Sequence, residues 1–361
     1  MRNEFIFVAN LMVQCEKIEL IMKILSSHRS KLGIDIGSYK TRIWSSNDGL
    51  VVDEPTLIAV EEKTKKIITV GQQALEMMGR VGAGITVYAP FQRGRIYDFD
   101  LARAMLKVYL QRVYKASYFF SPIIMVSYSI GITKVAKESI SDLIYSLGAK
   151  QVFHIAQPLV AAIGAGIPIA DASGSVIFQL GAGLAEAAII SLGSVVLSKS
   201  SYSAGFYADK LVVEVMRKKY GIIISSKQAE KIRIKIGSLL ESDKTTLVTG
   251  KDLIDQSPKE ILISSKDILP VMNNLAKEYE QLLKDLLSKV PAELTADLLD
   301  KGMLLSGGMA QIEGLDDYFT ETLGIPVTVV DRADTAVING IATALDHLEL
   351  FKESFGYKSN V

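Results

Sequence analysis

The stretch that decides the fold is VIFQLGAGLAEAAII, residues 176–190. Apolar residues lead into a glycine turn at Gly181-Ala182-Gly183, and apolar residues follow it. This pattern predicts a buried strand, a tight turn and a second strand. Backbone N–H groups in such a turn form a concave nest that binds anions, so the turn is a candidate phosphate loop.

A second copy of the unit occurs early in the chain, as LGIDIGSYKTRIW at residues 32–44. Both copies have an apolar strand, a polar residue (Asp35 or Gln179), one apolar residue, a glycine and a second β-prone run. An internal duplication of this kind predicts two related α/β domains that face each other across a cleft.

A third glycine turn, Ser306-Gly307-Gly308-Met309, follows an apolar strand and precedes a helix pattern within residues 302–324. One such turn is a weak signal, because many turns of this kind only connect strands to helices. Three turns that each follow a buried strand indicate a nucleotide. Two of them would grip the β- and γ-phosphates from opposite sides, and the third would suit the adenosine or the α-phosphate.

The rest of the chain alternates strand and helix patterns without a low-complexity linker. The small residues at 161–166 predict that the helix opened by Pro158 approaches its neighbours closely. The expected strands or hairpins are 54–71, 121–129, 151–156 and the strand that begins at Ile325, and the expected helices are 98–114, 134–150, 204–221, 225–240, 268–290 and the one that begins at Asp334.

The amino-acid composition excludes some classes of protein and some kinds of metal site. The chain has 361 residues, of which 49% are hydrophobic and 22% charged, so it can bury the cores of two domains. Lys plus Arg number 40 and Asp plus Glu number 40, a balance that gives no support for nucleic-acid binding. A single cysteine, Cys15, excludes an intrachain disulfide and a cysteine metal cage, and three histidines argue against a histidine metal site. With so few of these residues, we expect a cytosolic protein. No apolar run reaches the ~18–20 residues of a membrane span.

The N-terminal residues 1–30 form an extension of unusual character. Residues 16–25 alternate charged and apolar side chains at helical spacing. We expect that the native protein starts at Met22 and that the first 21 residues come from a start codon assigned too far upstream. A membrane-surface helix and a packing or frayed extension are the alternatives.

The duplicated glycine turns resemble those of the actin, hexokinase and DnaK-type ATPase superfamily. Within it, the chain resembles the MreB family of rod-shape-determining bacterial actins. The likeness runs from about Leu32 to Leu350 through ordered segments such as DEPTLIAV, GITKVAKESI, AAIGAGIP, QAEKIRIKIGS and LSGGMAQIEGLDDYF. The resemblance implies an α/β protein with the actin-like ATPase fold, in which two duplicated RNase H-like domains surround a nucleotide cleft and each carries a smaller subdomain.

The resemblance also divides the chain. We expect an extension at 1–30, a first domain at 31–168 to which 335–361 returns, with its small subdomain at about 54–85, and a second domain at 169–334, with its small subdomain at about 206–267.

The cofactors implied by the resemblance are ATP and Mg²⁺. Asp35 would hold the ion through water, since Mg²⁺ keeps much of its hydration shell. The implied nucleotide contacts are Gly37, Ser38, Tyr39 and Lys40 in the first loop, Gly181, Ala182, Gly183 and Leu184 in the second, Glu230, Lys231, Ile232 and Arg233 on a helix, and Gly307, Gly308, Met309 and Ala310 in the adenosine loop.

Four positions depart from the family pattern at or near the candidate catalytic residues Gln157, Asp35 and Gln179. Gln157 stands where MreB proteins generally have a glutamate that orients the attacking water, although actin has glutamine there. Gln179 stands where the family has an aspartate, and Leu184-Ala185 replace two threonines. We therefore expect a protein that binds ATP but hydrolyses it slowly or not at all. The alternative is that nucleotide binding is lost altogether.

Two surface segments are candidates for contacts. In YKASYFFSP, residues 114–122, Phe119 and Phe120 correspond to an apolar pair that dips into the bilayer in MreB, or they pack inward. Residues 251–265 read as a hairpin that forms a longitudinal filament contact, or one that is merely solvated.

The resemblance implies an actin-like cytoskeletal protein in the cytoplasm, at the inner face of the cell membrane. Its partners would be copies of itself in filaments, the membrane, and morphogenesis and cell-wall synthesis proteins, with no nucleic acid. The first alternative is a non-polymerising membrane adaptor of the FtsA or PilM kind, with a degenerate nucleotide site. A sugar kinase of the same superfamily is disfavoured, because the chain lacks an obvious catalytic aspartate.

Overall fold

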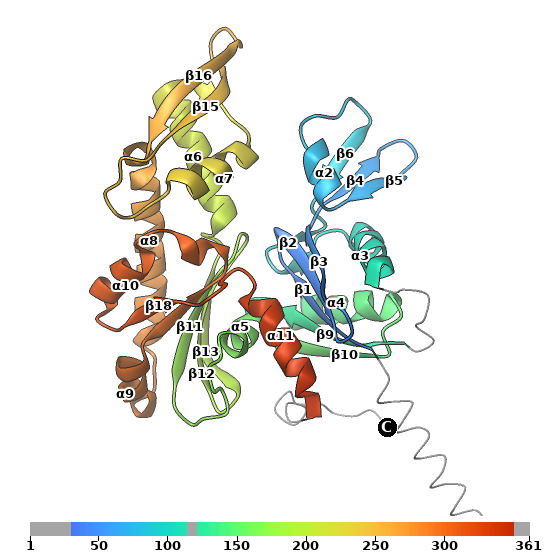
Figure 1. The fold of residues 1–361 in the computed structure, drawn as a ribbon, viewed down its shortest axis with the longest axis vertical. Coiled ribbons are helices and arrows are strands. Elements are labelled where there is room, and N and C mark those ends of the chain that lie inside the picture. The colour runs from blue at the N-terminus through green and yellow to red at the C-terminus, as the bar shows by residue number, and fades with distance from the viewer. Residues whose placement is uncertain (1–29, 114–120, 350–361) are drawn as a thin grey trace, which may run out of the picture.

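The computed structural model describes residues 30–113 and 121–349. The extension predicted at 1–30 therefore lies almost wholly outside the described residues, as do Phe119 and Phe120. Figure 1 shows two lobes side by side, each built on a sheet with helices against it. We call the lobe that contains β1 (Lys31–Ile36) the first lobe and the lobe that contains β11 (Ser175–Leu180) the second lobe.

The sheet of the first lobe has the strand order β10-β9-β1-β2-β3. Strand β1 is buried along nearly its whole length, because helices cover both faces of the sheet. Its neighbours β2 and β3 continue it as an antiparallel meander, and β9 and β10 run parallel to it. The bounds are β1 Lys31–Ile36, β2 Lys40–Ser45, β3 Gly49–Pro55, β9 Ile123–Tyr128 and β10 Gln151–Ala156, with helices α3 Phe99–Val113 and α4 Lys134–Ser146.

The sheet of the second lobe repeats this arrangement in the order β13-β12-β11-β17-β18. Strands β11, β12 and β13 form the antiparallel meander, and β17 and β18 run parallel to β11. The same order and the same strand directions in both sheets confirm the duplication predicted from the sequence. The bounds are β11 Ser175–Leu180, β12 Ala185–Ser191, β13 Ser194–Ser201, β17 Met303–Ser306 and β18 Val327–Val329, with helices α8 Ser265–Leu287, α9 Ala292–Lys301 and α10 Leu315–Leu323.

Two helices, α5 (Gln157–Gly164) and α11 (Ala336–Asp346), lie between the sheets. A Cβ on Gly164 would lie 2.0 Å from the carbonyl oxygen of Ala336, and one on Gly340 would lie 1.7 Å from that of Val160. Only glycine allows the two backbones to come so close, which confirms the close approach predicted from the small residues.

Each lobe carries a further part at its upper end in Figure 1. In the first lobe, this part has a sheet of order β5-β4-β6 with one helix, and the short pair β7 and β8 follows it. In the second lobe, it has a sheet of order β14-β15-β16 and two helices. The bounds are β4 Ile58–Glu61, β5 Ile67–Val70, α2 Gln72–Met77, β6 Ile85–Tyr88, β7 Phe91–Gln92, β8 Arg95–Ile96, α6 Gly205–Tyr220, β14 Ile222–Ile223, α7 Ser226–Ile236, β15 Thr245–Asp252 and β16 Pro258–Ser264.

Three elements differ from the sequence predictions. Helix α7 ends at Ile236, because Gly237 adopts an extended conformation, whereas the apolar pattern predicted a helix to 240. The hairpin predicted at 251–265 begins at Thr245, so the predicted range holds its turn and second strand. The third glycine turn leads into a four-residue 3-10 helix, η1 (Gly308–Gln311), before α10 begins.

Candidate functional site

A cleft of about 450 Å³ lies between the lobes. All three glycine turns line it, together with the start of α5, the helix α7 and the segment before α11. The polar and glycine positions around it are Asp35, Gly37, Ser38, Tyr39, Lys40, Arg42, Gly94, Gln157, Gln179, Gly181, Gly183, Glu186, Gly205, Glu230, Arg233, Gly237, Gly307, Gly308, Gln311 and Asp334.

The first two turns are tight hairpin loops that are closed by the same kind of backbone bond. Gly37 N–H donates to the Lys40 carbonyl at 2.9 Å, and Gly181 N–H donates to the Leu184 carbonyl at 2.8 Å. The loops touch across the cleft, since a Cβ on Gly183 would lie 2.3 Å from Ser38 Oγ. Two matching loops from opposite lobes thus meet at one place, with no side chain on Gly183 to keep them apart.

The third turn is held by its backbone. Gly307 has a φ of 89°, which favours glycine, and a Cβ there would lie 2.2 Å from the Leu180 carbonyl oxygen. Its N–H donates to the Ala333 carbonyl at 2.7 Å. Met309 lines the cleft beside Gly308, which has open space around it. This turn therefore offers a flat, unobstructed wall.

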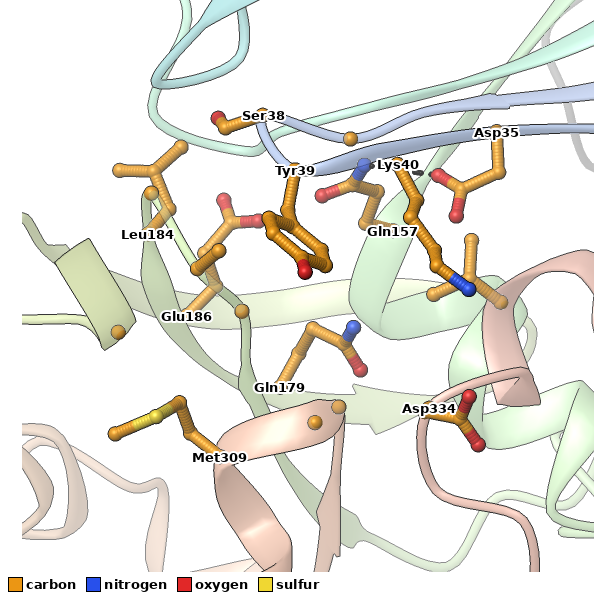
Figure 2. Close-up of a pocket in the computed structure, with 18 of the residues that line it drawn as sticks. Asp35, Ser38, Tyr39, Lys40, Gln157, Gln179, Leu184, Glu186, Met309 and Asp334 are labelled. Atoms are coloured by element: carbon orange, nitrogen blue, oxygen red, sulfur yellow. Dashed lines mark hydrogen bonds between the residues drawn. The ribbon is translucent and has the colours of Figure 1, made fainter. Parts of the chain in front are cut away.

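Asp35 and Gln157, predicted from far apart in the sequence, come together at the end of β1 (Figure 2). Gln157 Nε2 donates to Asp35 Oδ1 at 3.3 Å, and Ser127 Oγ donates to the same oxygen at 2.8 Å. Burial raises the pKa of the Asp35 carboxyl, and the Arg42 guanidinium acts in the opposite direction. The single acid predicted to hold a metal is thus buried and already accepts two hydrogen bonds.

Gln179 is the penultimate residue of β11, and its amide lies in the cleft (Figure 2). Its Oε1 is buried and has no hydrogen-bond partner among the residues that the structure describes. An unsatisfied buried acceptor costs free energy, so this oxygen is suited to a donor supplied by water or by a ligand.

Lys40 and Arg42, both on β2, line the cleft and form ion pairs with the same carboxylate. Lys40 Nζ and Arg42 Nε both lie 3.0 Å from Asp53 carboxylate oxygens. Arg42 also donates to the backbone carbonyl of Asp334 at 2.7 Å and to its carboxylate at 3.2 Å, which ties β2 to the segment before α11. Arg42 and Asp334 were not predicted as site residues.

Helix α7 brings Glu230 and Arg233 to the cleft wall. Tyr39 O–H donates to Glu230 Oε2 at 3.4 Å, across the two lobes, and burial together with the Glu230 charge raises the pKa of Tyr39 to about 12. Arg233 Nε donates to Asp209 Oδ1 at 2.7 Å, so its charge is already paired. Three predicted contact positions do not line the cleft: the exposed Lys231 and the buried Ile232 and Ala310.

Glu186 is a further cleft residue that the sequence predictions missed. It lies on β12, directly across the hairpin from Gln179, and is 1% exposed. Its Oε1 accepts from Ser129 Oγ at 2.6 Å and from Ile130 N–H at 2.7 Å, both in the first lobe. Burial raises the pKa of its carboxyl. The signal in the sequence was one acid within an otherwise apolar strand, AEAAIIS.

The donor set for a divalent metal is small. Residues 30–113 and 121–349 contain no group of three or more His, Cys, Asp or Glu side chains placed to hold an ion. Asp35 is the carboxylate at the predicted metal position, and the position facing it is the neutral amide of Gln179. A hydrated Mg²⁺ that arrives on phosphates needs only one or two carboxylates, so the site meets the lower limit of that requirement.

Within the described ranges, no helix is both long and apolar enough to cross a membrane.

Known proteins are similar to this chain in sequence and in architecture. The MreB/Mbl protein family matches residues 29–353. The cell shape-determining protein MreB of Escherichia coli is 32% identical over 338 residues, which cover 92% of this chain and 97% of that protein. The cell shape-determining protein Mbl of Bacillus cereus is 31% identical over 320 residues, which cover 88% of this chain and 96% of that protein.

Solved structures agree with these matches. The crystal structure of MreB 5 of Spiroplasma citri bound to AMPPNP has a TM-score of 0.87 and 29% identity, and the likeness covers 91% of this chain and 99% of that one. The MamK double helical filament, at 16% identity and a TM-score of 0.76, supports the fold alone. The chain has the predicted actin-like ATPase fold, and it belongs to the MreB/Mbl family of actin-like, cell shape-determining proteins.

Proposed function

We propose that this chain binds ATP in the cleft between its lobes. The observation that carries the proposal is the contact between the two matching hairpin loops at Ser38 and Gly183. Their backbones approach one point from both lobes, as a triphosphate grip requires. The MreB 5 structures of Spiroplasma citri, with bound AMPPNP and bound ADP, support the same ligand class.

The turns would contact different parts of the nucleotide. The first loop with Lys40 and the second loop would contact the phosphates, and α7 with the third turn would contact the nucleoside. Lys231, Ile232 and Ala310 would contribute by positioning neighbouring residues. The proposed direct contacts are Gly37, Ser38, Tyr39, Lys40, Gly181, Ala182, Gly183, Leu184, Glu230, Arg233, Gly307, Gly308 and Met309.

We propose that hydrolysis is weak. Gln157 would orient the attacking water with its amide, which is a very poor base, and phosphoryl transfer depends mainly on positioning and charge stabilisation. Mg²⁺ would enter on the phosphates and supply charge stabilisation there. Asp35 would hold its water on one side. On the other side Gln179 offers a neutral amide oxygen in place of a carboxylate.

We further propose that nucleotide-bound copies assemble into filaments that set cell shape. The hairpin of β15 and β16 supports this, because Leu247 and Leu262 face each other across it and are 63% and 60% exposed. An exposed apolar pair on a projecting hairpin is suited to contact with a neighbouring subunit. The MreB and Mbl relatives are cell shape-determining proteins.

The proposed location is the cytoplasm at the inner face of the cell membrane, where filaments would guide morphogenesis and cell-wall synthesis proteins. Phe119 and Phe120 would touch the bilayer. The neutral charge balance gives no support for a nucleic-acid partner.

Sedimentation of the purified chain, with and without ATP and with and without anionic liposomes, tests the assembly. We expect ATP-dependent pelleting without liposomes and co-pelleting with them. A protein that binds liposomes but stays monomeric with saturating ATP would instead be an adaptor of the FtsA or PilM kind. Loss of liposome binding in Phe119→Ser/Phe120→Ser, with polymerisation kept, would assign the membrane contact to this pair.

A further inference from the structure

At the predicted metal position the cleft offers one acid, Asp35, which is the fewest that a hydrated Mg²⁺ on phosphates requires. Asp35 Oδ1 already accepts hydrogen bonds from Ser127 and Gln157, and the facing position is the neutral Gln179. Mg²⁺ in such sites is held by carboxylates together with the substrate phosphates. Because the protein offers one carboxylate at this position, the ion adds little to nucleotide binding beyond its bond to the phosphates themselves.

A protein cation is available at the same place. Lys40 closes the first loop, and Figure 2 shows its side chain extending into the cleft between Asp35 and Asp334. An ammonium group acts as a point charge toward phosphate, and its flexible four-carbon stem can reorient.

The present partner of Lys40 can release it at little cost. The Lys40–Asp53 pair has side chains that are 33% and 36% exposed, and ion pairs this exposed contribute little stability. Asp53 would not be left without a partner, because Arg42 Nε lies 3.0 Å from its other carboxylate oxygen. Arg42 itself is less free to move, since it also holds Asp334 at two points.

We propose that Lys40 exchanges Asp53 for the nucleotide phosphates and takes over the charge-neutralising role of the divalent ion, so that this chain binds ATP and ADP without Mg²⁺. This inference rests on the proposed function, since it concerns the same cleft. It adds that the affinity depends on a protein cation rather than on a metal.

The test is the dissociation constant for ATP and for ADP, measured by calorimetry on the full chain in excess Mg²⁺ and again in EDTA. We expect the wild-type constant to change by less than about tenfold between the two conditions. Lys40→Met should raise the constant in EDTA by about tenfold or more, as expected when a charge-assisted contact is lost, and should raise it less in Mg²⁺. Lys40→Arg should retain most of the affinity in EDTA.

Lys199→Met is the matched control. Lys199 pairs with Asp285 outside the cleft lining, and their side chains are 37% and 43% exposed, close to the values for Lys40 and Asp53. Its affinity should equal the wild-type affinity in both conditions. Thermal melting of all variants confirms that each is folded.

The outcomes separate the two proposals. If the affinity measured in Mg²⁺ falls a hundredfold or more in EDTA, metal-independent binding is contradicted, while the proposal that the chain binds ATP stands. An equal effect of Lys40→Met in both conditions, or none, also overturns it. Absence of binding in both conditions overturns the proposed function itself.

Discussion

The Glu186 carboxylate in the second lobe accepts a hydrogen bond from the Ser129 hydroxyl in the first lobe at 2.6 Å. Glu186 is 1% exposed and also accepts from Ile130 N–H at 2.7 Å. It lies two residues after the second hairpin loop, and Ser129 directly follows β9. The strand that positions one candidate phosphate loop is therefore fastened to the opposite lobe through a buried side chain.

This bond predicts energetic coupling between the two residues. Glu186→Ala, Ser129→Ala and the double variant should give a coupling energy of about 1 kcal/mol in urea unfolding, because hydrogen bonds to an acid are stronger than average and this one is buried. The exposed pair Lys134 and Glu138, 3.8 Å apart on α4, serves as the control and should couple by less than ~0.5 kcal/mol. Additive effects of the Glu186 and Ser129 changes would show that the bond does not hold the lobes together.

Gln179→Asp should raise the rate of phosphate release by at least about tenfold, a change of ~1.4 kcal/mol in the barrier. The new carboxylate would face Asp35 and order a water of the hydrated metal. Gln179→Asn is the control, because it shortens the side chain without adding charge. The rates are measured on assembled filaments at saturating ATP. Equal rates for the Asp and Asn variants, or wild-type turnover comparable to that of an ordinary MreB, would contradict weakened hydrolysis.

His154 predicts a dependence of stability on pH. Burial, assisted by the nearby Lys137 charge, lowers the pKa of its ring from 6.5 to about 4. The unfolded state therefore binds a proton more readily, so this contribution to stability is fully present above pH 6.5 and is lost as the pH falls through 4. Between pH 7 and pH 5 the loss should be about 2 kcal/mol.

The measurement for His154 is urea unfolding of the wild type and of His154→Phe at both pH values. The variant keeps a ring beside Tyr128, whose ring centroid lies 6.2 Å away, and should lose ~2 kcal/mol less on acidification. Parallel pH curves for the wild type and His154→Phe would refute the assignment.

The exposed hairpin predicts an assembly defect. Leu247→Asp/Leu262→Asp places two like charges opposite each other on the outer face of the hairpin and should abolish ATP-dependent pelleting. Nucleotide affinity should stay unchanged, since neither residue lines the cleft. Leu299→Asp, at another exposed leucine on α9, is the control and should still polymerise. Normal pelleting of the double variant would place the filament contact elsewhere.

The sequence predicted the site best at the glycine turns, because few other residues can replace glycine in such turns. Gly37, Gly181 and Gly307 each follow a buried strand, and all three turns reach the same cleft. The repeated strand–turn–strand pattern likewise predicted both sheets, because the topology is the same in each.

Other parts of the site could not be predicted, because they depend on contacts between distant segments. Glu186 acquires its partners only when β12 meets the end of β9, and Arg42 meets Asp334 across 292 residues of chain. Lys231 and Ile232, in contrast, were predicted as site residues but do not line the cleft. They were predicted along with Glu230, but only one side of α7 faces the cleft, because successive helical positions point in different directions.

The most direct measurement is the binding of ATP and ADP to the purified chain in the presence of Mg²⁺. Opposed glycine loops should give saturable binding with a dissociation constant well below ~1 mM. Gly183→Val should weaken it at least about tenfold, because a Cβ there would lie 2.3 Å from Ser38 Oγ, whereas Gly82→Val, with nothing within 4 Å, should not. No detectable binding of either nucleotide at ~1 mM, in a chain that melts cooperatively, would contradict a nucleotide role for this cleft.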